Sequence, residues 1–95
     1  MQYGLNKKPA DWMLEMAKRH KMLRKQAGFT QSELARRSGV SLGSLKRFEL
    51  TGQISLESLL KLSQLLNRIN YFELFFNPTK DLKEIEKLFS DKTRK

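Results

Sequence analysis

The sequence predicts an all-α fold built from five helices. Apolar residues recur at the three- and four-residue spacing of amphipathic helices, and no strand-like alternation interrupts them. Residues suited to helix caps stand between the apolar runs. The 95 residues, 39% of them hydrophobic, suit one compact domain. We expect a polar arm over residues 1–8, a globular domain over residues 9–76 and a helical or flexible tail over residues 77–95.

The first helix is expected to begin at Pro9 and to end near Gly28. Proline suits the first helical position because its missing N–H has no intrahelical partner there. The apolar residues of this segment recur at helical spacing: Trp12, Met16, Leu23 and Ala27. We therefore expect Trp12 and the methionines of this helix to lie in the core.

The next three helices each begin at a residue that can cap a helix. Thr30, followed by Glu33, forms a capping-box pattern ahead of a helix that ends at Gly39. Ser41 is expected to cap a short third helix. Ser55 is expected to cap a fourth helix, whose apolar residues are all leucines: Leu56, Leu59, Leu60, Leu62, Leu65 and Leu66.

The fifth helix and the tail follow at the C-terminal side. Asn70 with Glu73 forms another capping-box pattern at the start of an aromatic run that ends at Phe76. The dipeptide Asn77-Pro78 marks a turn or boundary. Beyond it one more amphipathic stripe predicts a helical tail: Leu82, Ile85, Leu88 and Phe89.

Charge is the strongest global signal. Nineteen Lys and Arg residues against ten Asp and Glu residues give a net charge of +9, which favours a partner rich in phosphate, most often nucleic acid. Without cysteines, and with His20 as the one histidine, we expect neither a disulfide nor a metal site. No apolar run reaches the length of a membrane span and no signal-peptide pattern opens the chain. We expect a cytoplasmic protein without a cofactor.

Residues 30–49 predict two short helices joined by a tight turn. Gly39 allows a positive φ at the corner, and Ala35 is small enough for the helices to cross closely. Four apolar residues can hold the pair on a core: Leu34, Val40, Leu45 and Phe48. A second helix presented at a steep angle fits the DNA major groove, which is wide enough to admit it.

The run "LRKQAGFTQSELARRSGVSLGSLKRFELTG" and the leucine-rich helix after it resemble the λ-repressor/Cro (XRE) type of helix-turn-helix domain. The resemblance extends from about residue 22 to residue 75, more than half of the chain. It implies a five-helix fold that binds double-stranded DNA as a homodimer on a palindromic operator. It also implies that the base-facing region of the recognition helix comprises Ser41, Leu42, Gly43, Lys46 and Arg47.

Other residues are expected to contact phosphate or to support the fold. The start of the first helix of the motif offers side chains and free backbone N–H groups to a phosphate, and the resemblance implies that Gln31 clamps the DNA backbone. The candidate phosphate contacts are Thr30, Gln31, Arg36, Ser44, Thr51 and Gln53. The resemblance also implies a structural ion pair between Arg24 and Glu49.

Two departures from the family pattern affect the predicted site. Leu42 and Gly43 stand where many relatives carry Gln or Asn for adenine, so direct base readout is expected to fall mainly on Lys46 and Arg47. Leu42 is expected to point outward, where it can offer only a methyl contact. The segment "ELTG", residues 49–52, is one residue longer than the usual turn, which leaves the placement of the following loop open.

The aromatic run near the end of the domain is richer than one small core requires. We expect it to expose a surface for a second copy or another partner, formed by Tyr71, Phe72, Phe75 and Phe76. The leading function is therefore a dimeric, operator-binding transcriptional regulator, in particular a repressor. One alternative is a HipB-type antitoxin that neutralises a HipA-like toxin and represses its own operon. A minor alternative is a protein-interaction module without DNA binding, and no catalytic motif predicts an enzyme.

Overall fold

The structure is a computed structural model that describes residues 7–78, and this part of the chain is helical with no strand. Its helices are α2 (Pro9–Gln26), α3 (Gln31–Ser38), α4 (Leu42–Thr51), α5 (Leu56–Leu65) and α6 (Asn70–Phe75). The predicted all-α, five-helix fold is confirmed. Most of the predicted polar arm and the predicted tail helix lie outside the described residues. Between residues 7 and 78, no helix combines the length and apolar character needed to cross a membrane.

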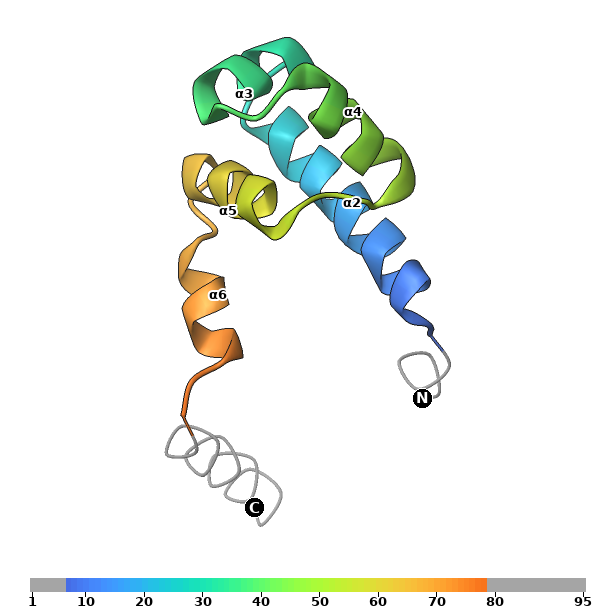
Figure 1. The fold of residues 1–95 in the computed structure, drawn as a ribbon. Coiled ribbons are helices and arrows are strands. Elements are labelled where there is room, and N and C mark those ends of the chain that lie inside the picture. Colours follow the sequence, from blue (N-terminus) through green and yellow to red (C-terminus); the bar gives the residue numbers. More distant parts are fainter. Residues whose placement is uncertain (1–6, 79–95) are drawn as a thin grey trace.

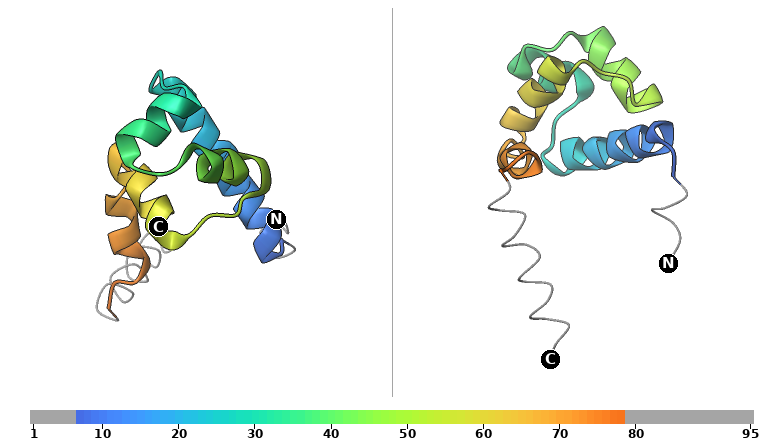
Figure 2. Two further views of the ribbon diagram at one scale, coloured as in Figure 1. Left: turned by 45° about the horizontal axis from the view of Figure 1, so that its top comes forward. Right: turned by 60° about the horizontal axis from the view of Figure 1, so that its bottom comes forward.

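Four of these helices form the packed body of the domain. Helix α4 packs along α2, and α3 contacts both α4 and α5. Figures 1 and 2 show α3 and α4 together at one end, and α6 extending from α5 away from them. The buried core lies between α2, α3, α4 and α5 and consists of Ala17, Leu34, Ala35, Val40, Leu45, Phe48 and Leu62.

Local hydrogen bonds explain where α3, α4 and α5 begin. The Thr30 hydroxyl accepts the backbone N–H of Glu33, whose side chain accepts the N–H of Thr30, so the predicted capping box is present. The hydroxyls of Ser41 and Ser55 cap α4 and α5 by accepting the backbone N–H three residues later. The three predicted caps are confirmed.

The predicted cap of the last helix is wrong. Ile69 occupies the N-cap position of α6 with helical backbone angles, φ −63° and ψ −30°, and Asn70 is the first residue of the helix itself. The backbone N–H groups of Tyr71 and Phe72 donate to the carbonyls of Arg68 and Ile69, at 3.2 and 3.0 Å. Because the turn already starts upstream, the Asn70 side chain is not needed as a cap.

The face of α2 that enters the core also differs from the prediction. The buried residues of α2 are Ala17, His20 and Arg24, whereas Trp12 and Met16 are each 42% exposed. The expected burial of Trp12 and the methionines of this helix is therefore wrong. The apolar residues form a neighbouring stripe of the helix, but α4 covers the stripe that carries Ala17, His20 and Arg24.

Helix α5 buries less of its leucine stripe than the spacing suggests. Leu62 is completely buried, four of the other leucines are half-buried, and Leu56 is 66% exposed. The exposed and half-buried leucines face regions that α2, α3 and α4 do not fully cover. Parts of α5 are consequently accessible in the described domain.

Candidate DNA-binding site

The turn between α3 and α4 orients the recognition helix. Gly39 ends α3 with φ +83°, and its N–H donates to the Ala35 carbonyl over 3.0 Å. A side chain is strained at such a φ, which is why glycine suits this corner. The Val40 N–H then donates to the Ser38 hydroxyl, and α4 begins immediately after Ser41. The turn thus places the inner face of α4 on the core and leaves its outer face open.

The outer face of α4 carries most of the predicted base-facing residues. The exposed residues among them are Ser41, Gly43, Lys46 and Arg47, with Ser44 beside them. Leu50, one helical turn after Lys46, is 79% exposed on the same helix. Sequence reasoning did not single out Leu50, although its four-residue spacing from Lys46 is the signal that places it on this face.

Leu42 does not belong fully to this outer face. It is half-buried and packs against the core, so the expectation that it points outward is wrong. Leu42 is the first residue of α4 and directly follows the turn. Burial of its apolar side chain against the core is favourable because it removes apolar surface from water.

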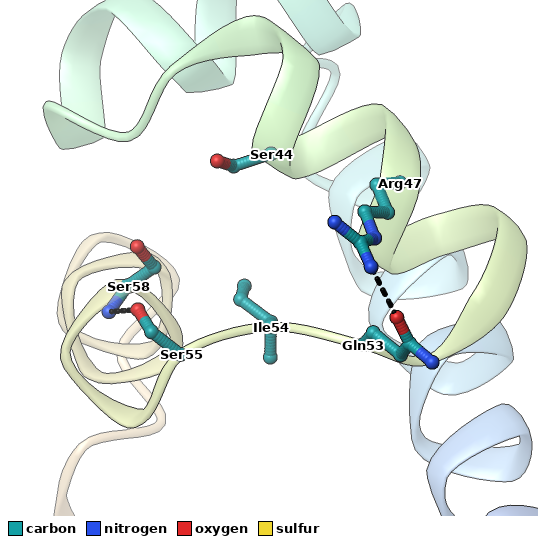
Figure 3. Close-up of a pocket in the computed structure, with 6 residues that line it drawn as sticks. All are labelled: Ser44, Arg47, Gln53, Ile54, Ser55 and Ser58. Atoms are coloured by element: carbon teal, nitrogen blue, oxygen red, sulfur yellow. Dashed lines mark hydrogen bonds between the residues drawn. The ribbon is translucent and has the colours of Figure 1, made fainter.

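Arg47 is held beside the loop that follows α4. Its Nη2 donates to Gln53 Oε1 over 2.6 Å. The Thr51 hydroxyl donates to the Arg47 carbonyl and accepts the N–H of Gln53, at 2.7 and 3.1 Å. Figure 3 shows Arg47 and Gln53 joined on one side of a hollow of about 300 Å³, lined by Ser44, Arg47, Gln53, Ile54, Ser55 and Ser58. Sequence analysis missed the pairing of Arg47 with Gln53.

The extra residue of the "ELTG" segment is absorbed by α4 itself. The helix continues through Thr51, and Gly52 ends it with φ +83°. A Cβ on Gly52 would lie 2.8 Å from the backbone carbonyl carbon of Met13 in α2. The end of the recognition helix thus packs closely against the backbone of α2, and this contact fixes the position at which the following loop begins.

The predicted phosphate contacts at the start of α3 are already engaged within the protein. The Gln31 amide donates to Glu49 Oε1 over 3.0 Å, and the Thr30 hydroxyl serves as the helix cap. Arg36 is exposed. The guanidinium of Arg37 lies 5.2 Å from the centre of the Phe29 ring, in a cation–π contact.

A buried ion pair connects α2 with the end of α4. Arg24 Nε and Nη2 donate to the two carboxylate oxygens of Glu49 over 2.8 and 3.0 Å, and Arg24 Nη1 donates to the Phe29 carbonyl over 2.9 Å. The exposed fractions of the Arg24 and Glu49 side chains are 7% and 3%. Paired charges in this bidentate geometry fix the orientation of α4 on α2.

His20 lies against this ion pair and was missed by sequence analysis. Its Nδ1 is 3.3 Å from Glu49 Oε2, although neither ring nitrogen forms a hydrogen bond within the described residues. Its ring packs edge-on against Phe48, with 5.1 Å between centroids. His20 precedes Arg24 by four residues, so the two share one face of α2. That spacing was the available signal.

Burial and charge shift the pKa values of His20 and Glu49. Burial lowers the pKa of His20 below its usual value, and the attraction of the Glu49 carboxylate offsets this only in part. Burial tends to raise the pKa of Glu49, but hydrogen bonds from Arg24 and Gln31 and the neighbouring charges outweigh it, so this pKa is lowered. Neutral His20 and ionised Glu49 are therefore favoured in the folded protein.

The four residues of the predicted partner surface do not form one patch: three of them line a groove and the fourth lies outside it. Tyr71, Phe72 and Phe75 line an apolar groove together with residues of α2 and α5. Phe76 is 91% exposed and lies outside the lining of that groove, with its ring 5.8 Å from that of Phe75. Tyr71, Phe72 and Phe75 belong to α6, which extends away from α3 and α4 (Figure 1), and Phe76 directly follows it.

Comparison with known families agrees with this geometry. The model of the helix-turn-helix family matches residues 21–74, more than half of the chain. Searches among curated proteins and solved structures gave no match. The matched region contains both helices of the motif, the buried ion pair and the supporting helix α5. The chain belongs to the λ-repressor/Cro-like (XRE-type) helix-turn-helix family of DNA-binding proteins.

Proposed function

We propose that the protein is a transcriptional repressor that binds a palindromic operator as a homodimer. The observation that carries this proposal is the division of α4 into two faces. Leu45 and Phe48 are buried, while Lys46 and Arg47 are exposed on a chain with net charge +9. A helix anchored in this way can enter the major groove without disturbing the core.

We assign different roles to the two basic residues of this face. The exposed ammonium group of Lys46 can reach the O6 and N7 acceptors of guanine. The bond from Arg47 to Gln53 directs its guanidinium toward the hollow with Ser44 and Ser58, where a guanidinium and hydroxyl groups suit a backbone phosphate. Base choice would then depend on Lys46, and Arg47 would contribute affinity for any sequence.

Binding of the purified protein to the DNA upstream of its own gene tests the proposal. A scrambled duplex serves as the reference, and both are titrated at two salt concentrations. Lys46→Ala is expected to reduce the preference for the upstream fragment by about 5- to 150-fold, the equivalent of about 1–3 kcal/mol. Arg47→Gln is expected to weaken binding to both duplexes alike. It should also reduce the slope of log K against log salt concentration by about 1, as the loss of one phosphate contact requires.

Lys61→Ala is the matched control for this experiment. Lys61 is an exposed lysine of α5 that pairs with Glu57 at 3.6 Å. Lys61→Ala therefore removes one positive charge, as Lys46→Ala does, but at a position that is not on the outer face of α4. We expect this variant to keep the sequence preference of the wild type. Equal affinity of the wild type for both duplexes would overturn the repressor proposal.

The dimer is proposed to form through the exposed aromatic end of α6. Large side chains remain accessible there: Leu74 and Phe75 of α6, and Phe76, which follows the helix. A two-fold axis would place two copies of α4 about one DNA turn, roughly 34 Å, apart. In the antitoxin alternative the same end of α6 would bind a toxin. Self-association of the pure protein distinguishes the two assignments, because only the dimer forms without another partner.

A further inference from the structure

An apolar groove of about 330 Å³ lies between α2, α5 and α6. Its lining is mostly apolar and includes Met16, Leu23, Leu59, Leu66, Phe72 and Phe75. Phe48 and His20 also line it, so the groove extends inward to the buried side of α4. Apolar surface of this extent is favourably covered by other apolar groups.

Helix α6 forms one wall of this groove and has little cover of its own. It contains six residues, none of them buried. Tyr71 and Phe75 line the groove and are nevertheless 62% and 68% exposed. A helix this short is unstable in water unless other parts of the protein pack against it. A group that fills the groove would therefore stabilise α6 as well.

We infer that residues 82–89 of the same chain form a helix that docks in this groove. Four apolar residues in this segment recur at helical spacing and would face inward: Leu82, Ile85, Leu88 and Phe89. Helix α6 ends at Phe75, which leaves residues 76–81 as the connection. Loops of two to eight residues commonly join neighbouring antiparallel helices, so the segment can fold back along the wall that precedes it.

The charges of the segment match those of the groove. Lys80, Lys83 and Lys87 recur at spacings of three and four residues, on the side of the predicted helix opposite its apolar stripe. Glu84 and Glu86 fall between these lysines and the stripe, one on each side. Two exposed arginines line the groove, on α2 and next to α6.

Both arginines can form an ion pair with a further carboxylate. Arg19 donates to Glu15 over 3.1 Å while its side chain is 70% exposed. The guanidinium of Arg68 lies 5.9 Å from the centre of the Tyr71 ring. Docking would bring the two glutamates beside these cations and keep the lysines in water. Charge complementarity of this kind mainly selects the orientation of the docked helix.

Thiol cross-linking tests the inference directly because the chain contains no cysteine. Met16 lines the groove and is 42% exposed, so Met16→Cys should be tolerated. It is combined with Ile85→Cys, treated with a short bismaleimide in the absence of DNA, and analysed on a denaturing gel. The control combines Met16→Cys with Lys83→Cys, which is two residues away on the opposite side of the predicted helix.

The inference predicts a cross-linked monomer. The Ile85→Cys pair should give at least about fivefold more of it than the Lys83→Cys pair, because docking raises the effective concentration of only one thiol near Met16→Cys. A cross-linked dimer would instead place the segment of a second copy in the groove and overturn docking within one chain. Equal yields from the two pairs, or no cross-link, would overturn it as well. DNA binding does not enter this measurement, so its result is independent of the proposed repressor function.

Thermal unfolding gives a second readout without cysteines. Ile85→Asp places a charge in the proposed apolar contact and should lower the midpoint by about 5 °C or more. Lys83→Asp makes a larger change in net charge on the opposite side of the segment and should shift the midpoint by less. Equal shifts for the two variants would contradict docking through the apolar stripe.

Discussion

At the scale of single residues, Glu49 is the centre of the buried polar contacts that stabilise this domain. Its carboxylate is 3% exposed and accepts hydrogen bonds from Arg24 and Gln31, with His20 Nδ1 at 3.3 Å. Removing one member of a buried charge pair typically costs about 3–5 kcal/mol, because the other charge is left uncompensated. These contacts tie the end of the recognition helix to α2 and to the start of α3.

The lowered pKa of His20 predicts a pH dependence of stability. The unfolded chain binds a proton near the usual pKa of 6.5, whereas the folded protein resists it. The free energy of unfolding should therefore fall as the pH drops below 6.5, by up to about 1.4 kcal/mol per pH unit, until the folded pKa is reached. Urea unfolding between pH 7.5 and about 5.5 measures this fall.

His20→Gln should flatten the pH dependence in that range, because His20 is the one histidine of the chain. The lowered pKa of Glu49 contributes stability that is fully present above its usual value of 4.5 and is lost only as the pH falls further. The Glu49 contribution is therefore nearly constant over the pH range of the urea measurement, where the fall in stability reports on His20. A wild-type and a His20→Gln protein with the same slope would contradict the role assigned to His20.

At the scale of the elements, the two ends of α4 are fixed differently. In the turn that precedes it, Gly39 has φ +83° and no atom within 4 Å of an added Cβ, so only the backbone angle requires glycine there. At its end, Gly52 has the same φ, and an added Cβ would also lie 2.8 Å from the Met13 backbone. The end of α4 therefore depends on close packing against α2 as well as on the turn.

A series of glycine substitutions separates these effects. Gly43→Ala should raise the free energy of unfolding by about 0.5–1 kcal/mol, since Gly43 is helical and has free space around it. Gly39→Ala should lower it by about 1–2 kcal/mol through the left-handed backbone alone. Gly52→Ala should lower it further, because α2 must also shift. Urea unfolding of the three variants checks the order, and a smaller loss for Gly52→Ala than for Gly39→Ala would disprove the packing argument.

At the scale of the whole molecule, buried and accessible apolar surface are separated in space. The core lies between α2, α3, α4 and α5, whereas Leu74 of α6 is 63% exposed and Phe76, the residue after this helix, is 91% exposed. The proposed use of these surfaces places DNA on the outer face of α4 and a second copy at the end of α6 (Figure 1). Dimerisation would then not obstruct the recognition helix.

Phe76→Ser should weaken the proposed dimer without unfolding the monomer. The Phe76 ring lies 5.8 Å from that of Phe75, and Phe76 is 91% exposed, so its loss should affect association more than stability. Sedimentation equilibrium is expected to show a dissociation constant raised by about tenfold or more, the equivalent of about 1.4 kcal/mol. Leu56→Ser is the control, since Leu56 is 66% exposed but lies at the start of α5. Equal weakening by both substitutions would argue against α6 as the interface.

The starts of three helices and the inner face of the helix-turn-helix motif could be predicted from the sequence. A cap such as Thr30 or Ser55 bonds to a backbone group three residues away, so the relevant interaction is local. Leu45 and Phe48 were predicted to be buried from their spacing alone. The prediction failed at Asn70, because the backbone before it had already entered a helical turn.

Some of the candidate site could not be predicted in this way. The sequence indicated that Lys46 and Arg47 belong to one helix, but it contained no signal that Gln53 would hold Arg47. It likewise marked Gln31 as a contact for DNA, whereas the Gln31 amide bonds to Glu49, eighteen residues away. Such pairings depend on the angle between helices, which several packing contacts determine together.

The sequence by itself determined the helical class, most helix starts, the glycine corner and the basic character of the protein. These properties depend on local backbone preferences, on short hydrogen bonds and on composition. Only the tertiary structure decided that α2 buries Ala17, His20 and Arg24 in place of Trp12 and Met16. The physical reason is that α2 buries the face on which its neighbours pack, and Glu49 of α4 makes burial of Arg24 and His20 possible by pairing with one and lying beside the other. Here the packing of α4 on α2 made that choice.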